Sequence, residues 1–179
     1  MTKSATTAAL IWSAVLGVSA VFGSYFFACV FPFAAIATIA ALTLDVRRGL
    51  ALVGATWLAN QIVGFSLMNY PQTFDTVALG VSLGLGALAA YGSARLVLRI
   101  SADRLSLYPL LALSAAFVAY QIVIFGGALA FGGVDNFSPA IIAGVASNDA
   151  FWFAGLITAW LTLQRALPVR FADPQTATA

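Results

Sequence analysis

Histidine and glutamate are absent from this sequence of 179 residues, and cysteine occurs once, as Cys29. Without an imidazole base, Ser-His-Asp and Cys-His catalytic arrangements are excluded, as are histidine-rich metal sites. A single cysteine excludes an internal disulfide and a cysteine-rich zinc or iron–sulfur site. We therefore expect a protein that is not an enzyme and that has no intrinsic cofactor.

Charged residues are also scarce. They make up 8% of the chain, against about 25% in soluble domains, whereas hydrophobic residues make up 62%. Such a surface could not be covered with polar groups in water, so the sequence predicts an all-α integral membrane protein. Its eight lysines and arginines are too few for a nucleic-acid-binding surface.

Long apolar runs set the number of membrane spans, since a helix needs roughly 20 apolar residues to cross a bilayer. The first run, from Ala8 to Leu44, is too long for one span. Gly23-Ser24 and Pro32 interrupt it, because both loosen or restrict helical geometry. Residues 168–179 are polar and are expected to form a disordered cytoplasmic tail. Residues 1–167 then form one domain of six transmembrane helices, at about 8–23, 33–46, 49–68, 75–98, 106–131 and 138–166.

The charged residues test this number of spans, because cytoplasmic segments of membrane proteins are enriched in lysine and arginine. With six spans and both termini cytoplasmic, the outer loops contain only Asp75 and Asp135 as charged residues. Five spans would place Lys3 outside. The distribution favours six spans, and we expect them to lie in a bacterial cytoplasmic (inner) membrane. All eight cations then lie inside: Lys3, Arg47, Arg48, Arg95, Arg99, Arg104, Arg165 and Arg170.

Small residues recur every four positions in two predicted helices, and in lipid such residues let helix backbones approach closely. The helix at 75–98 contains Ala78, Ser82, Gly86, Ala90 and Ala94, with Gly80 and Gly84 beside them. The first helix contains Ala9, Ser13 and Gly17. Either series could pack within the chain or dock a separate membrane subunit.

Polar residues inside the spans share a depth, at the bilayer midplane or in its outer half, in the expected topology. The outer loops add aromatic side chains and amides. Aromatic side chains with a few convergent polar groups are typical of a concave small-molecule site. We therefore predict an outward-facing substrate site formed by Tyr25, Cys29, Asn60, Gln61, Tyr70, Gln121, Asn136, Asn148, Asp149 and Trp152.

These residues also have structural interpretations. The amides could hydrogen-bond one another between helices, and the aromatic residues could form the ordinary interfacial belt. Asp149 is different, because no lysine or arginine lies inside a predicted span to pair with it. Its carboxyl must be protonated, be hydrated in a cavity, or face a cationic ligand or ion.

Six short helices, cytoplasmic termini, small-residue series and an outward-facing site resemble the substrate-binding S components of energy-coupling factor (ECF) vitamin transporters. The resemblance implies that Ala9, Ser13 and Gly17 meet a transmembrane partner, which in that family works with ATPase subunits. It also implies a site in the outer loops and outer helix ends, where Cys29, Tyr70, Asn136 and Asp149 fall. A solitary branch of the family transports cobalamin. In that case Cys29 would be a metal ligand to the cobalt.

The sequence therefore predicts an uptake protein that binds a vitamin or cofactor, cobalamin being one candidate, from the outer face and passes it inward. No GxxxxGK phosphate-binding sequence is present, so the chain cannot hydrolyse ATP itself. Two alternatives stay open. One is a proton- or cation-coupled carrier that uses Asp149, and the other is a non-transporting scaffold subunit of a larger membrane complex.

Overall fold

A computed structural model describes residues 11–12, 14–16, 18, 31–100 and 107–166. The described residues form helices joined by short loops, without a β-strand. Several predictions fall outside them, namely those on Ala9, Ser13, Gly17, Tyr25, Cys29 and the tail 168–179. The described helices are α2 (Phe33–Thr43), α3 (Val46–Ile62), its π-helical continuation η1 (Val63–Leu67), α4 (Phe74–Ile100), α5 (Tyr108–Phe131), the 3₁₀ turn η2 (Val134–Phe137) and α6 (Pro139–Ala166).

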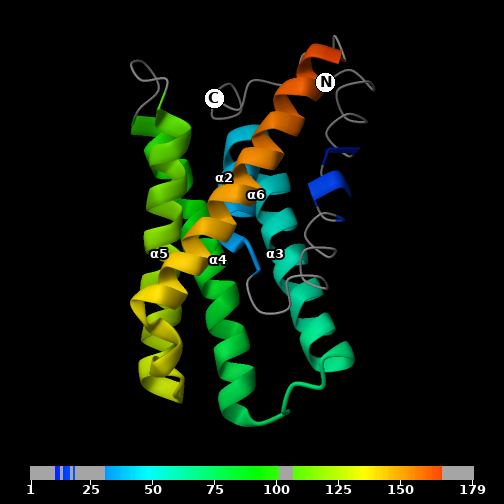
Figure 1. The fold of residues 1–179 in the computed structure, drawn as a ribbon. Helices are drawn as coiled ribbons and strands as arrows, with labels where there is room; N and C mark the ends of the chain where they lie inside the picture. Colours follow the sequence, from blue (N-terminus) through cyan, green and yellow to red (C-terminus); the bar gives the residue numbers. More distant parts are fainter. Residues whose placement is uncertain (1–10, 13, 17, 19–30, 101–106, 167–179) are drawn as a thin grey trace.

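Four helices are long and apolar enough to cross a membrane: Val46–Leu67, Phe74–Ile100, Tyr108–Phe131 and Pro139–Arg165. They run alternately up and down the bundle, and the connections at 68–73 and 132–138 lie at the same end of it (Figure 1). Their bounds lie close to the last four expected spans. An all-α, multi-pass membrane protein is therefore confirmed, whereas six spans and two cytoplasmic termini stay predictions.

Helix α2 differs from the expected span at 33–46, because it is too short to cross a membrane. Its 11 residues extend about 16 Å at about 1.5 Å per residue, against a hydrocarbon core roughly 30 Å thick. It ends early because Leu44 is extended and Asp45 caps α3, accepting a hydrogen bond from Arg48 N at 3.0 Å. Ten of its residues are buried among the neighbouring helices, so α2 is a central half-helix.

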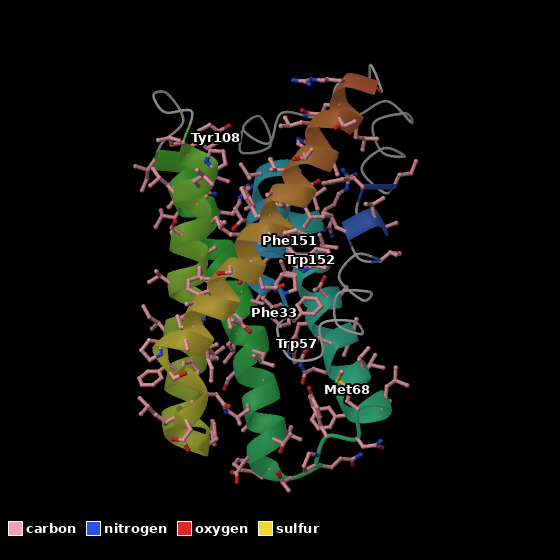
Figure 2. The ribbon with its side chains drawn as sticks, viewed as in Figure 1. Phe33, Trp57, Met68, Tyr108, Phe151 and Trp152 are labelled. Atoms are coloured by element: carbon pink, nitrogen blue, oxygen red, sulfur yellow. The ribbon has the colours of Figure 1, made fainter. Side chains whose placement is uncertain are left out.

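Both ends of α2 meet an ionisable side chain from another helix. At its first turn the Ala35 N–H donates to Asp149 Oδ1 of α6, at 2.8 Å. At its last turn Arg95 Nη1 of α4 donates to Ala41 O at 3.2 Å and to Leu44 O at 3.3 Å. A hydrogen-bond acceptor at the N-terminus and a cation at the C-terminus both complement the unpaired backbone groups of the helix ends. These contacts fix α2 with Phe33, its first residue, near mid-height of the bundle (Figure 2).

Close packing of α4 on α5 depends on small residues. A Cβ added at Gly86 would lie 2.9 Å from the Tyr120 ring, and one added at Gly127 would overlap the Ser82 side chain. Ser82, Gly86, Ala90 and Ala94 are all buried inside the bundle. The small-residue series of the fourth predicted helix thus packs within the chain.

The described cations gather at one end of the bundle. Arg47 and Arg48 lie in the first turn of α3, Arg95 and Arg99 near the end of α4, and Arg165 at the end of α6 (Figure 1). Asp75 and Asp135 lie at the opposite end, in the first turns of α4 and η2. This separation agrees with the orientation expected from the positive-inside rule.

Candidate functional site

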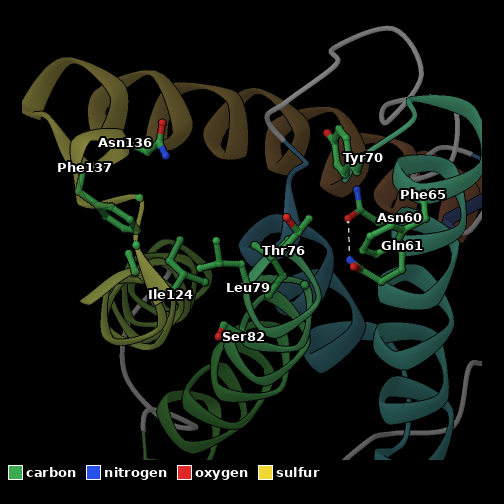
Figure 3. Close-up of a pocket in the computed structure, with 15 residues that line it drawn as sticks. Asn60, Gln61, Phe65, Tyr70, Thr76, Leu79, Ser82, Ile124, Asn136 and Phe137 are labelled. Atoms are coloured by element: carbon green, nitrogen blue, oxygen red, sulfur yellow. Dashed lines mark hydrogen bonds between the residues drawn. The ribbon is translucent and has the colours of Figure 1, made fainter. Parts of the chain in front are cut away.

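A pocket of about 230 Å³ opens at the end of the bundle that carries Asp75 and Asp135 (Figure 3). Its described lining comes from the end of α3, the following loop, the first half of α4, the last turns of α5, and residues 132–137. Leu79, Leu83, Ile124 and Ala128 make much of this surface apolar. Polar side chains reach the pocket from the α3 side and from the α5 side.

The α3 side carries two of the predicted amides. Gln61 Nε2 donates to Asn60 Oδ1 at 3.1 Å, and both side chains face the pocket (Figure 3). The helix then widens into the π-helical turn η1, and Phe65 within that turn also lines the pocket. Single π-helical turns occur frequently at functional sites because they redirect side chains. Here the turn adds an aromatic ring beside the amide pair.

The loop after η1 folds back onto the helix. Asn69 adopts the left-handed region at φ 53°, which asparagine tolerates better than most residues. This reversal lets Tyr70 N donate to Gly64 O at 3.1 Å, and the Tyr70 ring lies where a Cβ on residue 64 would be, at 2.8 Å. Phe65 and Tyr70 meet edge to face with ring centroids 6.4 Å apart. The loop therefore places a second aromatic ring at the pocket.

The floor of the pocket is the backbone of α4. A Cβ on Gly80 would overlap the Gln61 side chain, and one on Gly84 would lie 2.8 Å from the Trp57 ring. Trp57 Nε1 also donates to Gly80 O at 2.8 Å. The Gly80/Gly84 pair thus lets two α3 side chains lie directly on α4.

The α5 side is shaped by a glycine turn. Gly132 and Gly133 adopt φ values of 93° and 100°, which side chains other than glycine rarely accept. The turn brings Asn136 and Phe137 to the pocket, and Phe137 packs against Phe125 with ring centroids 5.1 Å apart. An amide and an aromatic ring therefore stand on this side too, opposite those of α3 (Figure 3).

The structure brings together four of the predicted site residues: Asn60, Gln61, Tyr70 and Asn136. Gln121, Asn148, Asp149 and Trp152 do not line this pocket. Phe65 and the apolar floor were missed, because an apolar residue in an apolar helix gives no signal of its own. The Gly80/Gly84 spacing was the one available signal, and it predicted helix packing, within the chain or against a separate subunit.

Asp149 lies in α6, apart from the pocket, and is 1% exposed. Its partner is the backbone of α2 through Ala35 N–H, a contact that the spacing of charged residues in the sequence does not predict. Among the described residues its Oδ2 has no hydrogen-bond partner. Asp149 therefore has a structural role at α2, and any role with a ligand stays a prediction.

The described lining residues carry no charged side chain, so the pocket offers hydrogen bonds and aromatic faces. Within the described ranges, no group of three or more cysteine, aspartate or similar ligands is placed to hold a metal ion. The metal role considered for Cys29 falls outside those ranges. Binding is the chemistry that this arrangement supports.

Comparisons with protein-family models, with curated proteins and with solved structures found no match to this chain. The likeness to ECF S components therefore stays a resemblance in predicted architecture. The function has to be argued from the pocket and the charge distribution.

Proposed function

We propose that this chain is an uptake protein of the bacterial inner membrane that binds a small molecule from the outer face and passes it inward. The pocket of about 230 Å³ is the observation that carries this function. It lies at the end of the bundle opposite the arginines, and arginine-rich segments stay in the cytoplasm. The pocket end thus faces outward in the favoured orientation.

Passage of the ligand requires a second step, since the pocket and the arginine end are separated by most of the length of α4. The chain has no phosphate-binding sequence of its own. We propose that transmembrane and ATPase subunits of the ECF type supply the energy, as the resemblance implies. A small-molecule ligand and these subunits are then its partners in the bilayer.

The size of the pocket limits the ligand. Drug-sized molecules occupy pockets of about 300–1,000 Å³, and the pocket here holds about 230 Å³. Cobalamin is far larger than this volume. Among vitamins and cofactors, we therefore favour one of one or two rings.

Ligand binding should raise the melting temperature of the purified chain. A ligand at about 100 times its Kd stabilises a protein by about 2.7 kcal/mol, which corresponds to about 5–10 °C for a chain of this size. The measurement is thermal unfolding in detergent with a panel that includes thiamine, flavins and cobalamin. Mass spectrometry of small molecules extracted from the fresh preparation accompanies it. An absence of both a shift and a co-extracted molecule would favour the scaffold alternative.

A proton-coupled carrier is the second candidate, and the environment of Asp149 favours it. This side chain is buried in the middle of α6, and within the described part of the chain its Oδ2 lacks a hydrogen-bond partner. A bare carboxylate oxygen in apolar surroundings is costly. A proton on Oδ2 removes that cost, and its release and uptake could drive transport.

Asp149→Asn separates the two candidates, because asparagine still accepts the hydrogen bond from Ala35 N–H but cannot release a proton. If coupling runs through this carboxyl, ligand binding in detergent is retained and uptake into proteoliposomes no longer responds to a pH gradient. The measurement is uptake of the ligand found by the panel, with and without the gradient. Unchanged gradient-driven uptake by the variant would contradict coupling through Asp149.

A further inference from the structure

No charged side chain lies in the described lining of the pocket. The polar groups there are side-chain amides, hydroxyls and one phenol, from residues such as Asn60, Thr76 and Tyr70. A charged ligand group that leaves water without a counter-charge loses far more free energy than amide hydrogen bonds return. We therefore infer that the part of a ligand buried against these residues is uncharged.

Aromatic rings stand on both sides of the pocket. Phe65 and Tyr70 form an edge-to-face pair on the α3 side, and Phe137 packs on Phe125 on the α5 side, with centroid distances of 6.4 Å and 5.1 Å. Rings held by a second ring offer fixed faces and edges to another π-system. A flat aromatic ligand matches this pair of walls better than a branched aliphatic one.

Two amides keep hydrogen-bonding capacity for a ligand. Gln61 uses one N–H for Asn60, and its carbonyl oxygen lies against Gly80, which leaves its second N–H for a ligand. Asn136, on the opposite side of the pocket, makes no side-chain hydrogen bond within the described part of the chain (Figure 3). Gln61 therefore offers a donor, and Asn136 offers a donor and an acceptor side by side, the pattern by which asparagine binds the edge of a heterocycle.

From these three features we propose that the ligand is a small, uncharged, planar heterocycle, hydrogen-bonded on opposite edges by the Gln61 N–H and the Asn136 amide. This inference rests on the proposed small-molecule site and names its ligand class. Carboxylated and phosphorylated relatives of the same rings are excluded by the uncharged lining. A one- or two-ring heterocycle fits the available volume of about 230 Å³.

Gly80 is the specificity-determining position in this arrangement. The Gln61 side chain occupies the space that a Cβ on residue 80 would fill, and Trp57 holds the same stretch of α4 backbone through its hydrogen bond to Gly80 O at 2.8 Å. A methyl group there would push the Gln61 amide out of its place. Gly80 therefore acts as a positioning residue for the amide that contacts the ligand.

The ligand test uses matched pairs of probes with the full chain in detergent. Nicotinamide is compared with nicotinate, and uracil with orotate, because each pair shares a ring and differs by a carboxylate. At least one neutral probe should bind in isothermal titration calorimetry, and its carboxylated partner should bind at least about tenfold more weakly, since one unpaired buried charge costs more than 1.4 kcal/mol.

The residue test uses variants with a matched glycine control. Gln61→Leu and Gly80→Ala should each weaken binding of the neutral probe by about tenfold or more, the cost of leaving a buried polar partner unpaired. Gly92→Ala, on the same helix, adds its methyl group into open space and should bind as the wild type does. The melting temperatures of all three variants show whether each one is folded.

The outcomes separate this ligand class from the proposed function. Equal binding of nicotinate or orotate, or unchanged binding by a folded Gln61→Leu variant, overturns the neutral heterocycle. If no probe binds and the molecule co-extracted with the wild type is not an uncharged planar heterocycle, the proposed ligand class is also overturned. A small-molecule site would still remain. No probe binding together with no co-extracted molecule overturns both.

Discussion

Replacement of Asp149 by leucine should lower the stability of the chain more than a typical substitution does. The carboxylate accepts the hydrogen bond from Ala35 N–H at the first turn of α2, and that turn is buried in the middle of the bundle. Leucine cannot accept it, so backbone N–H groups would be left unpaired in apolar surroundings, at a cost of about 2–5 kcal/mol. This is a large part of the stability of an ordinary domain.

The measurement is the melting temperature in detergent, which we expect to fall by about 10 °C for Asp149→Leu. The control is Asp149→Asn, which keeps the acceptor and should stay within a few degrees of the wild type. If leucine were tolerated as well as asparagine, α2 would not depend on this contact. If both variants lowered the melting temperature equally, the negative charge of Asp149, and not the hydrogen bond, would stabilise α2.

The four long helices could be predicted from sequence because their apolar runs are bounded by strong signals. Pro139 begins α6, and the Gly132-Gly133 pair ends α5. The arginines fix which helix ends share a side of the membrane. Length, caps and charge are local properties, and these were sufficient for the spans.

The short helix α2 could not be predicted in the same way. Its sequence is as apolar as a span, and the predicted span at 33–46 extends beyond Asp45. In the structure, Asp45 caps the next helix, α3. Its two ionisable partners, Asp149 and Arg95, come from positions more than fifty residues away in the chain. The spacing of lysine and arginine gives no partner for Asp149, because the partner is a backbone N–H.

The candidate site was half predicted for a related reason. Depth along the bundle follows from position along a helix, and Asn60, Gln61, Tyr70 and Asn136, which were expected at a similar depth, line one pocket. Asn148 and Trp152 have comparable depth but lie on α6, which packs mainly on α2. Which helices neighbour one another depends on packing between distant segments, and spacing within one helix does not determine it.

The neighbouring glycines 126 and 127 of α5 give a direct test of that packing. A Cβ on Gly127 would overlap the Ser82 side chain of α4, whereas one on Gly126 would meet nothing within 4 Å. Gly127→Val should therefore destabilise the chain by about 1–3 kcal/mol or more, the usual cost of overpacking a tight contact. Gly126→Val makes the same chemical change one residue away, where the side chain points out of the bundle, and should leave the melting temperature nearly unchanged.

Thermal unfolding of the two valine variants measures the difference, and a second substitution on α4 assigns its cause. Ser82→Gly removes the side chain that the new valine would strike, so it should restore part of the stability of Gly127→Val, a coupling between two residues in contact. In the Gly126→Val background the same substitution relieves no clash and should not change the melting temperature.

Equal melting temperatures for the two valine variants would mean that α4 and α5 do not meet at Gly127. Since the pocket floor lies on the same half of α4, the candidate site would then lose its α5 wall.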